Sequence, residues 1–105
     1  QERANSFKKR RDFVVNSLNK IKGLRCLKPE GAFYVFPSCK NLLNKKTKLK
    51  TDTDFVQTLL EQANVAVVQG SAFGLPGYFR ISYATSMENL KKAMDRIKSF
   101  CESLS

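Results

Sequence analysis

The sequence predicts an α+β protein, a two-layer sandwich in which helices cover one face of a small mixed three-stranded sheet. Apolar residues recur at helical spacing in three segments, and short runs of aromatic and β-branched residues lie between them. The predicted order is helix, strand, helix, strand, strand, helix. A chain of 105 residues has the length of one domain, residues 1–105, with one modest core.

The first helix is predicted from an amphipathic segment near the start of the chain. Its apolar stripe runs through Phe7, Val14, Leu18 and Ile21, with basic and polar residues between them. Gly23 is expected to end this helix, because glycine readily adopts the left-handed conformation that closes one.

The first strand and the second helix follow from local signals. Residues 31–36, GAFYVF, form an aromatic and β-branched run that Pro37 stops, as expected of a buried strand. After a basic loop at residues 39–51, Thr51 offers an N-cap oxygen and Asn64 is suited to close the helix. The apolar stripe of this helix consists of Phe55, Val56, Leu59, Leu60 and Ala63.

Two more strands and a last helix complete the fold. Residues 65–68 and 78–84 are the predicted second and third strands, and a glycine-rich loop at residues 70–77 joins them. A helical crossover allows the first two strands to be parallel, whereas the loop favours antiparallel pairing of the last two, so the sheet is expected to be mixed. Residues 85–88, TSME, form a capping box that starts the last helix. Its apolar stripe consists of Leu90, Ala93, Met94, Ile97, Cys101 and Leu104.

The chain is strongly basic, with 19 Lys plus Arg against 9 Asp plus Glu, a formal charge of +10. Such a charge fits a partner that is a nucleic acid, an anionic membrane surface or an acidic small molecule. Much of the excess lies at residues 8–11 and 40–50. The simpler interpretation is a solvated helix face and a solvated loop.

The cysteine and histidine content restricts the chemistry. Three cysteines, Cys26, Cys39 and Cys101, show no CxxC spacing, and the chain has no histidine to complete a zinc site or a Cys/His nucleophilic pair. No metal site is therefore expected. The cysteine usage fits a reducing compartment, and no apolar run reaches the length of a membrane span, so we expect a cytoplasmic protein without a membrane segment.

Arg80 is the candidate binding residue. It lies in the predicted strand at residues 78–84, where Phe79, Ile81 and Tyr83 alternate with Arg80 and Ser82. The alternation places Arg80 on the face opposite the apolar side chains. A guanidinium cannot be neutralised and suits a planar carboxylate held by two hydrogen bonds, so Arg80 is predicted to be a carboxylate receptor rather than the partner of a nearby surface acid.

Three blocks of sequence carry a family resemblance. KPEGAFYVFP, VAVVQGSAFG and GYFRISYATSMENLKKAMDRI resemble, in order and spacing, the C-terminal small domain of class I/II pyridoxal-phosphate aminotransferases, and most of all the bacterial type of aspartate aminotransferase. The resemblance implies that Arg80, in RISYA, binds the α-carboxylate of the substrate. One departure is Gln69, since the family often has proline before the glycine of the second block.

The resemblance also implies what the rest of a longer enzyme would supply. Transamination needs a lysine that forms the internal aldimine and a cradle for the cofactor phosphate, and the family keeps both in its large domain. We expect no catalytic or cofactor-binding residue in residues 1–105, no covalent pyridoxal phosphate here and no activity of this piece alone. The parent enzyme is expected to be a homodimer that transfers the amino group of an amino acid, with aspartate favoured, to a 2-oxo acid.

Two alternatives remain open on the residues alone. The aromatic run at residues 31–36 and the basic charge partly match a nucleic-acid-binding module of the RNA-recognition-motif (RRM) type. That fold, however, has the order βαββαβ, whereas a helix opens this chain. A purely structural or interaction domain, in which Arg80 has no ligand, is the other alternative.

Overall fold

The computed structural model describes residues 2–26, 34–44 and 46–104, and the backbone alone for residues 2–7. Three α-helices, two short 3-10 helices and three strands follow one another along the chain. They are α1 (Glu2–Asn19), β1 (Tyr34–Val35), η1 (Lys40–Leu42), α2 (Asp52–Ala63), β2 (Val68–Gln69), η2 (Gly70–Phe73), β3 (Phe79–Ser82) and α3 (Met87–Ser103). The predicted order of helices and strands is confirmed, although the predicted first strand falls partly outside the described residues.

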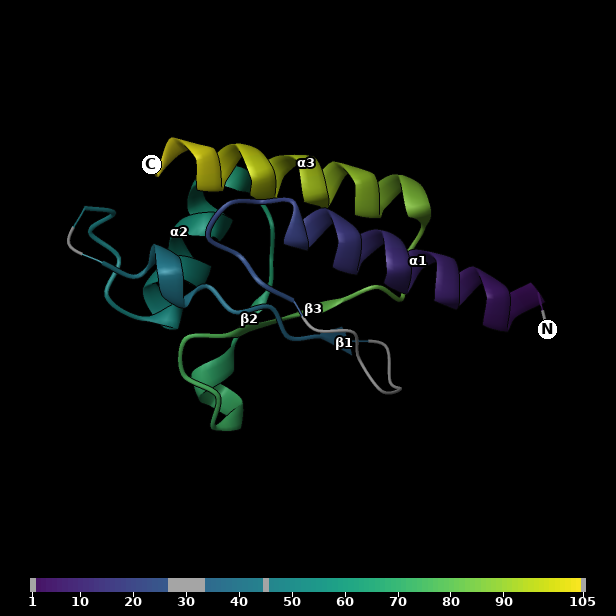
Figure 1. The fold of residues 1–105 in the computed structure, drawn as a ribbon, viewed down its shortest axis with the longest axis horizontal. Coiled ribbons are helices and arrows are strands. Elements are labelled where there is room, and N and C mark those ends of the chain that lie inside the picture. Colours follow the sequence, from purple (N-terminus) through teal and green to yellow (C-terminus); the bar gives the residue numbers. More distant parts are fainter. Residues whose placement is uncertain (1, 27–33, 45, 105) are drawn as a thin grey trace.

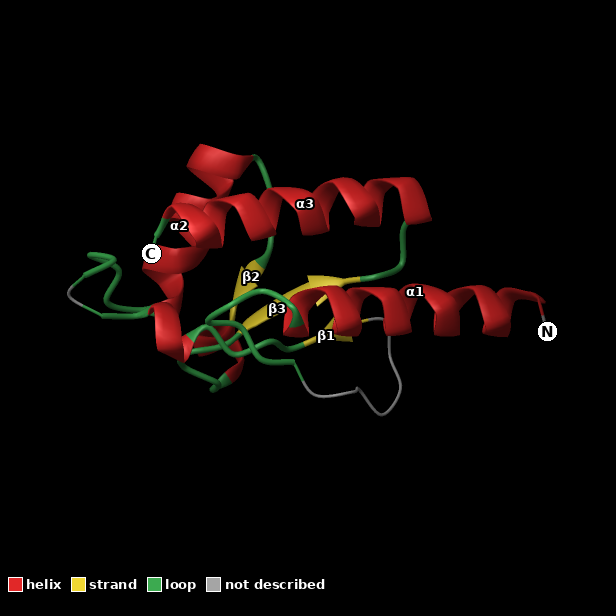
Figure 2. Cartoon of the chain, turned by 45° about the horizontal axis from the view of Figure 1, so that its top comes forward, coloured by secondary structure: helices red, strands yellow, loops and turns green. Residues whose placement is uncertain are grey.

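The helices form one layer and the sheet the other (Figures 1 and 2). α1 and α3 pack side by side, and α2 packs against both α3 and β2. The 3-10 helix η2 projects from the sheet on the side away from α3 (Figure 1). This two-layer α+β arrangement, with its helices on one face, is the one that the sequence predicts.

The prediction of a mixed sheet is wrong. The strand order is β1-β3-β2, and both pairings of β3 are antiparallel, with Tyr34 opposite Ser82 and Val68 opposite Arg80. β1 and β2 therefore run in the same direction, as a helical crossover allows, but β3 lies between them. Because they are not neighbours, no parallel ladder forms.

The predicted ends of α2 are confirmed in detail. The Thr51 side chain accepts a hydrogen bond from the Asp54 N–H at 3.2 Å, and Asn64 adopts the left-handed conformation with φ of 56°. A polar side chain before the helix and an asparagine after it provide hydrogen bonds for backbone groups that have no partner within the helix.

Other boundaries differ from the prediction. α1 ends at Asn19, and turns at residues 20–23 lead to Gly23, which has the expected left-handed conformation with φ of 95°. The Asn19 amide hydrogen-bonds both the N–H and the carbonyl of Cys26, at 2.8 and 2.7 Å. The N-cap of α3 is Ser86, whose hydroxyl accepts from the Asn89 N–H, so the cap stands one residue later than the predicted box. The second strand begins only at Val68, where its ladder with β3 starts.

The core lies between the two layers. Phe55 of α2 has its ring centroid 5.2 Å from that of Phe79 in β3 and 5.6 Å from that of Phe100 in α3, so one aromatic cluster joins two helices to the sheet. Leu42 and Leu49, from the segment predicted as a plain basic loop, are buried as well. The alternation of β3 is confirmed: Phe79 and Ile81 are buried, whereas Arg80 is half-buried and Ser82 exposed.

No helix within the described ranges is long and apolar enough to cross a bilayer.

Candidate functional site

Arg80 stands on the face of the sheet that the helices leave open. Its guanidinium carbon lies 4.2 Å from the centroid of the Tyr34 ring and 4.5 Å from the centroid of the Phe73 ring. Contacts of a cation with aromatic faces at such distances are attractive, and they restrain the long side chain of arginine. The strand thus presents a guanidinium held between two rings that come from β1 and η2.

The hydrogen-bonding edge of Arg80 has no protein partner among the described residues. None of the side-chain hydrogen bonds or ion pairs formed within these ranges includes its guanidinium; the carboxylates of Asp12 and Glu88, for example, pair with Arg11 and Lys92. The guanidinium is also not sealed in the core, since Arg80 is half-buried. Its five N–H donors are therefore available to an acceptor that comes from outside.

The surroundings of Arg80 are aromatic. Tyr34, Phe36 and Phe73 are 37%, 39% and 44% exposed, values that are high for large apolar side chains on a small domain. The Phe36 and Phe73 rings meet edge to face with their centroids 6.4 Å apart. We call these three residues the aromatic rim. A low-polarity rim of this kind strengthens the attraction between the arginine and an incoming carboxylate.

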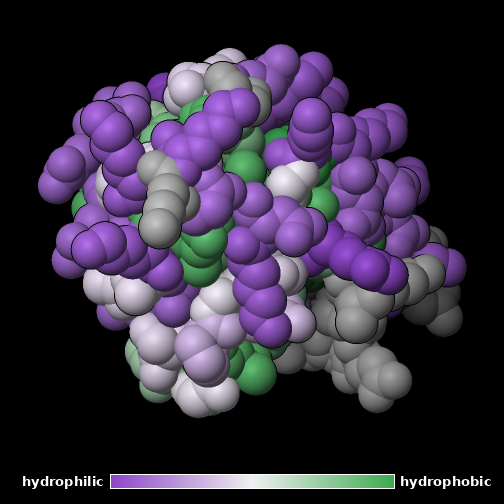
Figure 3. All heavy atoms as spheres, turned by 60° about the vertical axis from the view of Figure 1, so that its left-hand side comes forward, coloured by the Kyte–Doolittle hydropathy of each residue, from purple (hydrophilic) through white to green (hydrophobic). Residues whose placement is uncertain are grey.

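The loop that carries Phe73 has one backbone conformation imposed by its glycines. Gly70 is packed so closely that a Cβ atom there would collide with the carbonyl oxygen of Leu75, and Gly77 has φ of 86°. The Gly70 N–H donates to the Tyr78 carbonyl at 2.7 Å, and the Leu75 N–H donates to the Gly70 carbonyl at 2.8 Å. Figure 3 shows this part of the surface, at the lower edge of the view, as white and green beneath a largely purple face.

Asp52 holds the same loop from the side of α2, and this role was not predicted from the sequence. Its two carboxylate oxygens accept hydrogen bonds from the Ser71 N–H at 2.8 Å and from the Gly77 N–H at 3.2 Å, while the residue is only 3% exposed. Burial by itself raises the pKa of Asp52, but the hydrogen bonds from Ser71 and Gly77 lower it by more. The pKa of Asp52 therefore lies below its ordinary value.

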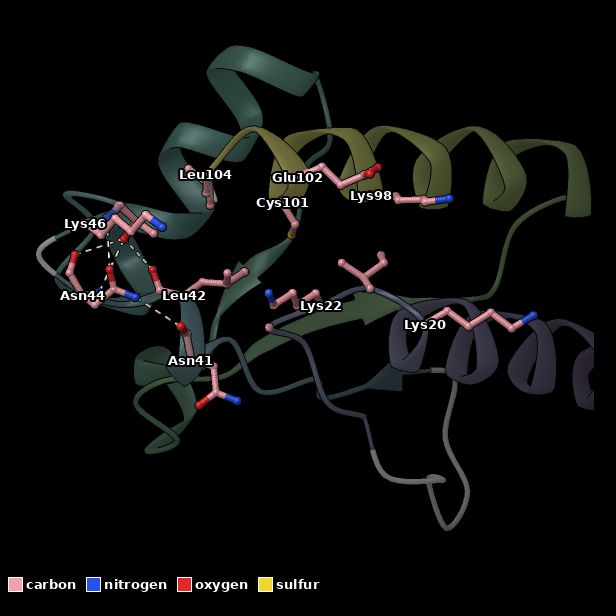
Figure 4. Close-up of a pocket in the computed structure, with 13 residues that line it drawn as sticks. Lys20, Lys22, Asn41, Leu42, Asn44, Lys46, Lys98, Cys101, Glu102 and Leu104 are labelled. Carbon is pink, nitrogen blue, oxygen red and sulfur yellow. Dashed lines mark hydrogen bonds between the residues drawn. The ribbon is translucent and has the colours of Figure 1, made fainter.

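Four of the lysines line a separate cavity. A cavity of about 640 Å³ lies between the end of α1, the segment after η1 and the end of α3, with Lys20, Lys22, Lys46 and Lys98 on its walls. In Figure 4 the side chains of Lys20 and Lys98 extend away from that of Lys46, so the four cations do not converge on one point. Arg80 is not part of this cavity.

The cysteines are buried thiols. Cys26, Cys39 and Cys101 form no disulfide. Burial raises the pKa of Cys26 to about 11 and that of Cys39 and Cys101 to about 12. Because only the thiolate is a nucleophile, none of the three is suited to covalent catalysis near neutral pH.

Comparison with known proteins assigns the chain to a family. The family model for class I and II aminotransferases matches residues 1–97. The chain belongs to this family of aminotransferases. The family resemblance noted in the sequence is thereby confirmed.

Individual relatives support this family assignment. An aspartate aminotransferase of Rhizobium meliloti is 58% identical over 109 aligned positions, which cover 100% of this chain and 27% of that protein. A probable aspartate/prephenate aminotransferase of Rhizobium leguminosarum bv. phaseoli is 58% identical over 99 positions, which cover 90% of this chain and 25% of that protein. The chain thus spans about a quarter of the length of the curated relatives it matches.

Solved structures share the fold. The crystal structure of the Rhizobium meliloti aspartate aminotransferase superposes with a TM-score of 0.95 at 58% identity, covering 99% of this chain and 27% of that one. The alanine aminotransferase of Pyrococcus furiosus gives a TM-score of 0.88 at 38% identity, covering 97% and 25%. Nothing in these comparisons supports the RRM alternative.

Proposed function

We propose that residues 1–105 are the C-terminal small domain of a pyridoxal-phosphate-dependent aminotransferase, and that Arg80 binds the α-carboxylate of its amino-acid substrate. The observation that carries the proposal is the guanidinium of Arg80, held between Tyr34 and Phe73 without a carboxylate partner in the described part of the chain. Its free edge suits two parallel hydrogen bonds to one carboxylate.

The contribution of this domain is orientation. A carboxylate gripped by two hydrogen bonds cannot rotate freely, so the rest of the amino acid takes a defined direction from the sheet. The aromatic rim surrounds this contact with apolar surface. Loss of such a positioning contact costs several kcal/mol of activation free energy, on the order of 3 kcal/mol.

The cofactor of the proposed enzyme is pyridoxal phosphate, as in the family, and the residues described here do not hold it. A lysine that would attach the cofactor covalently would need a desolvated site that keeps its amine uncharged. Every lysine whose side chain the structure describes is exposed. We therefore assign the lysine, and the cradle for the cofactor phosphate, to the remainder of the enzyme.

The substrates and assembly are proposed from the relatives. Two of these proteins carry the name aspartate aminotransferase or aspartate/prephenate aminotransferase, so we propose aspartate as an amino donor and a 2-oxo acid as the acceptor. We further propose that the enzyme is a cytoplasmic homodimer that binds neither nucleic acid nor a membrane, and that residues 1–105 alone have no activity.

A chimeric enzyme tests the proposal directly. The segment of the Rhizobium meliloti aspartate aminotransferase that matches this chain is replaced by residues 1–105, which the identity of 58% and the TM-score of 0.95 make feasible. Arg80→Lys keeps the charge but removes the planar fork, and it should raise the KM for aspartate by about 10- to 100-fold, since a bidentate charged contact contributes about 1.5–3 kcal/mol. The affinity for pyridoxal phosphate should not change.

Arg96→Ala is the matched control, because Arg96 is exposed on α3 and forms no ion pair with the described residues. Arg96→Ala removes a whole guanidinium, a larger change than Arg80→Lys makes, but it does so away from the aromatic rim, and it should leave the KM for aspartate unchanged. Equal kcat/KM values for Arg80→Lys and the unmodified chimera would refute the assignment of Arg80.

A further inference from the structure

Asp52 ties the loop of Phe73 to helix α2, and it does so at both ends of that loop. Ser71, which stands two residues before Phe73, donates its N–H to one carboxylate oxygen, and Gly77, at the far end of the loop, donates to the other. Among the side chains that the structure describes, Asp52 is the one charged group that is buried. A buried charge with two such partners has one fixed position.

Phe73 lies between these two anchored points, and its ring stacks on Arg80. The anchoring is shared with backbone contacts: the Gly77 carbonyl accepts from the Cys39 N–H at 2.9 Å. A carboxylate on α2 therefore determines where one of the two rings beside the guanidinium stands. The path from Asp52 to Arg80 consists of two hydrogen bonds, a short loop and one stacked ring.

We propose that Asp52 is a positioning residue for substrate binding, which acts on Arg80 through the placement of Phe73. This inference rests on the proposed function of Arg80 as the carboxylate receptor. It adds a residue that lies away from the guanidinium and is buried under the loop.

Both oxygens of Asp52 must be acceptors for this role, because each faces a backbone N–H. In Asp52→Asn one oxygen becomes an NH2 group, which confronts an N–H donor of Ser71 or Gly77 and cannot bond to it. The substitution preserves size and removes one end of the anchor. We expect the loop to open at that end and the Phe73 ring to leave the Arg80 guanidinium.

Asp54→Asn is the matched control. Asp54 lies in the same first turn of α2, so its substitution changes the interaction with the helix dipole in the same way. Its carboxylate accepts from the Lys50 N–H at 3.1 Å and not from the loop of Phe73. An effect that arises from the stability of α2 would appear in both variants, whereas an effect on the loop appears only in Asp52→Asn.

The experiment uses the chimeric enzyme with pyridoxal phosphate bound. Asp52→Asn should raise the KM for aspartate about tenfold, the effect of losing one charge-assisted hydrogen bond, while kcat per folded active site and the cofactor affinity stay unchanged. Asp54→Asn should leave the KM unchanged. Asp52→Ser, which retains one acceptor, is measured in the same way if Asp52→Asn gives no folded enzyme.

A double-mutant cycle with Phe73→Ala separates positioning from general stability. If Asp52 acts through Phe73, the double variant should have the KM of Phe73→Ala alone, because the ring that Asp52 places is gone. Leu75→Ala, in the same loop but without an aromatic ring to stack on Arg80, should remain additive with Asp52→Asn. In the 105-residue chain, the NMR shift of the Arg80 side-chain Nε–H should lose its ring-current displacement in Asp52→Asn.

The outcomes distinguish this inference about Asp52 from the proposed function of Arg80 on which it rests. A KM that Arg80→Lys does not raise refutes the proposed function itself. A KM that rises in Arg80→Lys but not in Asp52→Asn overturns the inference about Asp52 alone. Additive effects of Asp52→Asn and Phe73→Ala overturn it as well, since they would show that Asp52 acts by a route other than the Phe73 ring.

Discussion

Replacing Gln69 by proline is expected to stabilise the protein, because the backbone at Gln69 already has the geometry that proline imposes. Gln69 has φ of −63° and ψ of 138°, and the ring of proline fixes φ near −65°. The preceding residue, Val68, is in a strand, the conformation that proline favours for its predecessor.

The N–H that proline would remove is not used in the ladder with β3. The Gly70 N–H donates to the Tyr78 carbonyl, and in an antiparallel pair the hydrogen-bonded positions alternate. Val68, opposite Arg80, is therefore the next hydrogen-bonded position, and the Gln69 N–H points away from β3. It points to the outer side of β2, which is an edge strand.

The gain arises in the unfolded chain, which loses conformational freedom at residue 69. Such substitutions at compatible sites contribute about 0.4–1 kcal/mol, which for a domain of this length raises Tm by about 2–6 °C. Thermal unfolding of the chain, followed by circular dichroism at several scan rates, measures this shift. The same substitution should also lower hydrogen exchange at Gly70, where the loop of Phe73 begins.

Val68→Pro is the adjacent control. It removes an N–H that the ladder uses, so it should lower the free energy of unfolding by about 2 kcal/mol. If Gln69→Pro destabilised the protein as much as Val68→Pro, the alternation of hydrogen bonds along β2 would be wrong and the argument for Gln69 would fail.

Three further predictions concern the left-handed cap of α2 and the buried thiols. Asn64→Ala should lower the free energy of unfolding, measured by urea denaturation, by about 1 kcal/mol, whereas Asn64→Gly should change it by less than about 0.5 kcal/mol. The reason is that φ of 56° is unfavourable for a residue with a Cβ unless its side chain can form a local hydrogen bond, as that of asparagine can. Equal losses in the two variants would contradict this reason. The thiols should resist alkylation in the folded chain at neutral pH and react once it is unfolded. Because burial raises the pKa of Cys101 from 9.0 to about 12, its contribution to stability is fully present below pH 9.0 and is lost as the pH rises toward 12. Cys101→Ala should therefore show a smaller loss of stability over that interval, and an identical loss would count against the buried thiol as its source.

Much of the fold was predictable because its signals are local. Thr51 and Asn64 bound α2 as expected, since their side chains and backbones interact with groups a few residues away. The alternation in β3, which exposes Arg80 opposite Phe79 and Ile81, likewise follows from the pleat of a single strand. Phe100 was not predicted as a core residue, although its helical spacing from Ile97 was available as a signal.

Other features depend on segments that meet only in the folded chain. The strand order β1-β3-β2 results from how α2 crosses the sheet, and no short stretch of sequence contains it. Asp52 and Asp54 are alike in sequence, yet only Asp52 lies beneath the loop of residues 70–77. That difference depends on the direction in which each carboxylate leaves the helix.

The sequence by itself determined which residue carries the charge of the candidate site and on which face of its strand it lies. Only the tertiary structure decided that Tyr34 and Phe73, distant along the chain, stack on Arg80, and that Asp52 anchors the loop that carries Phe73. The physical reason is range: a strand pleat or a helix cap depends on neighbours along the chain, whereas stacking and buried hydrogen bonds depend on how the layers pack.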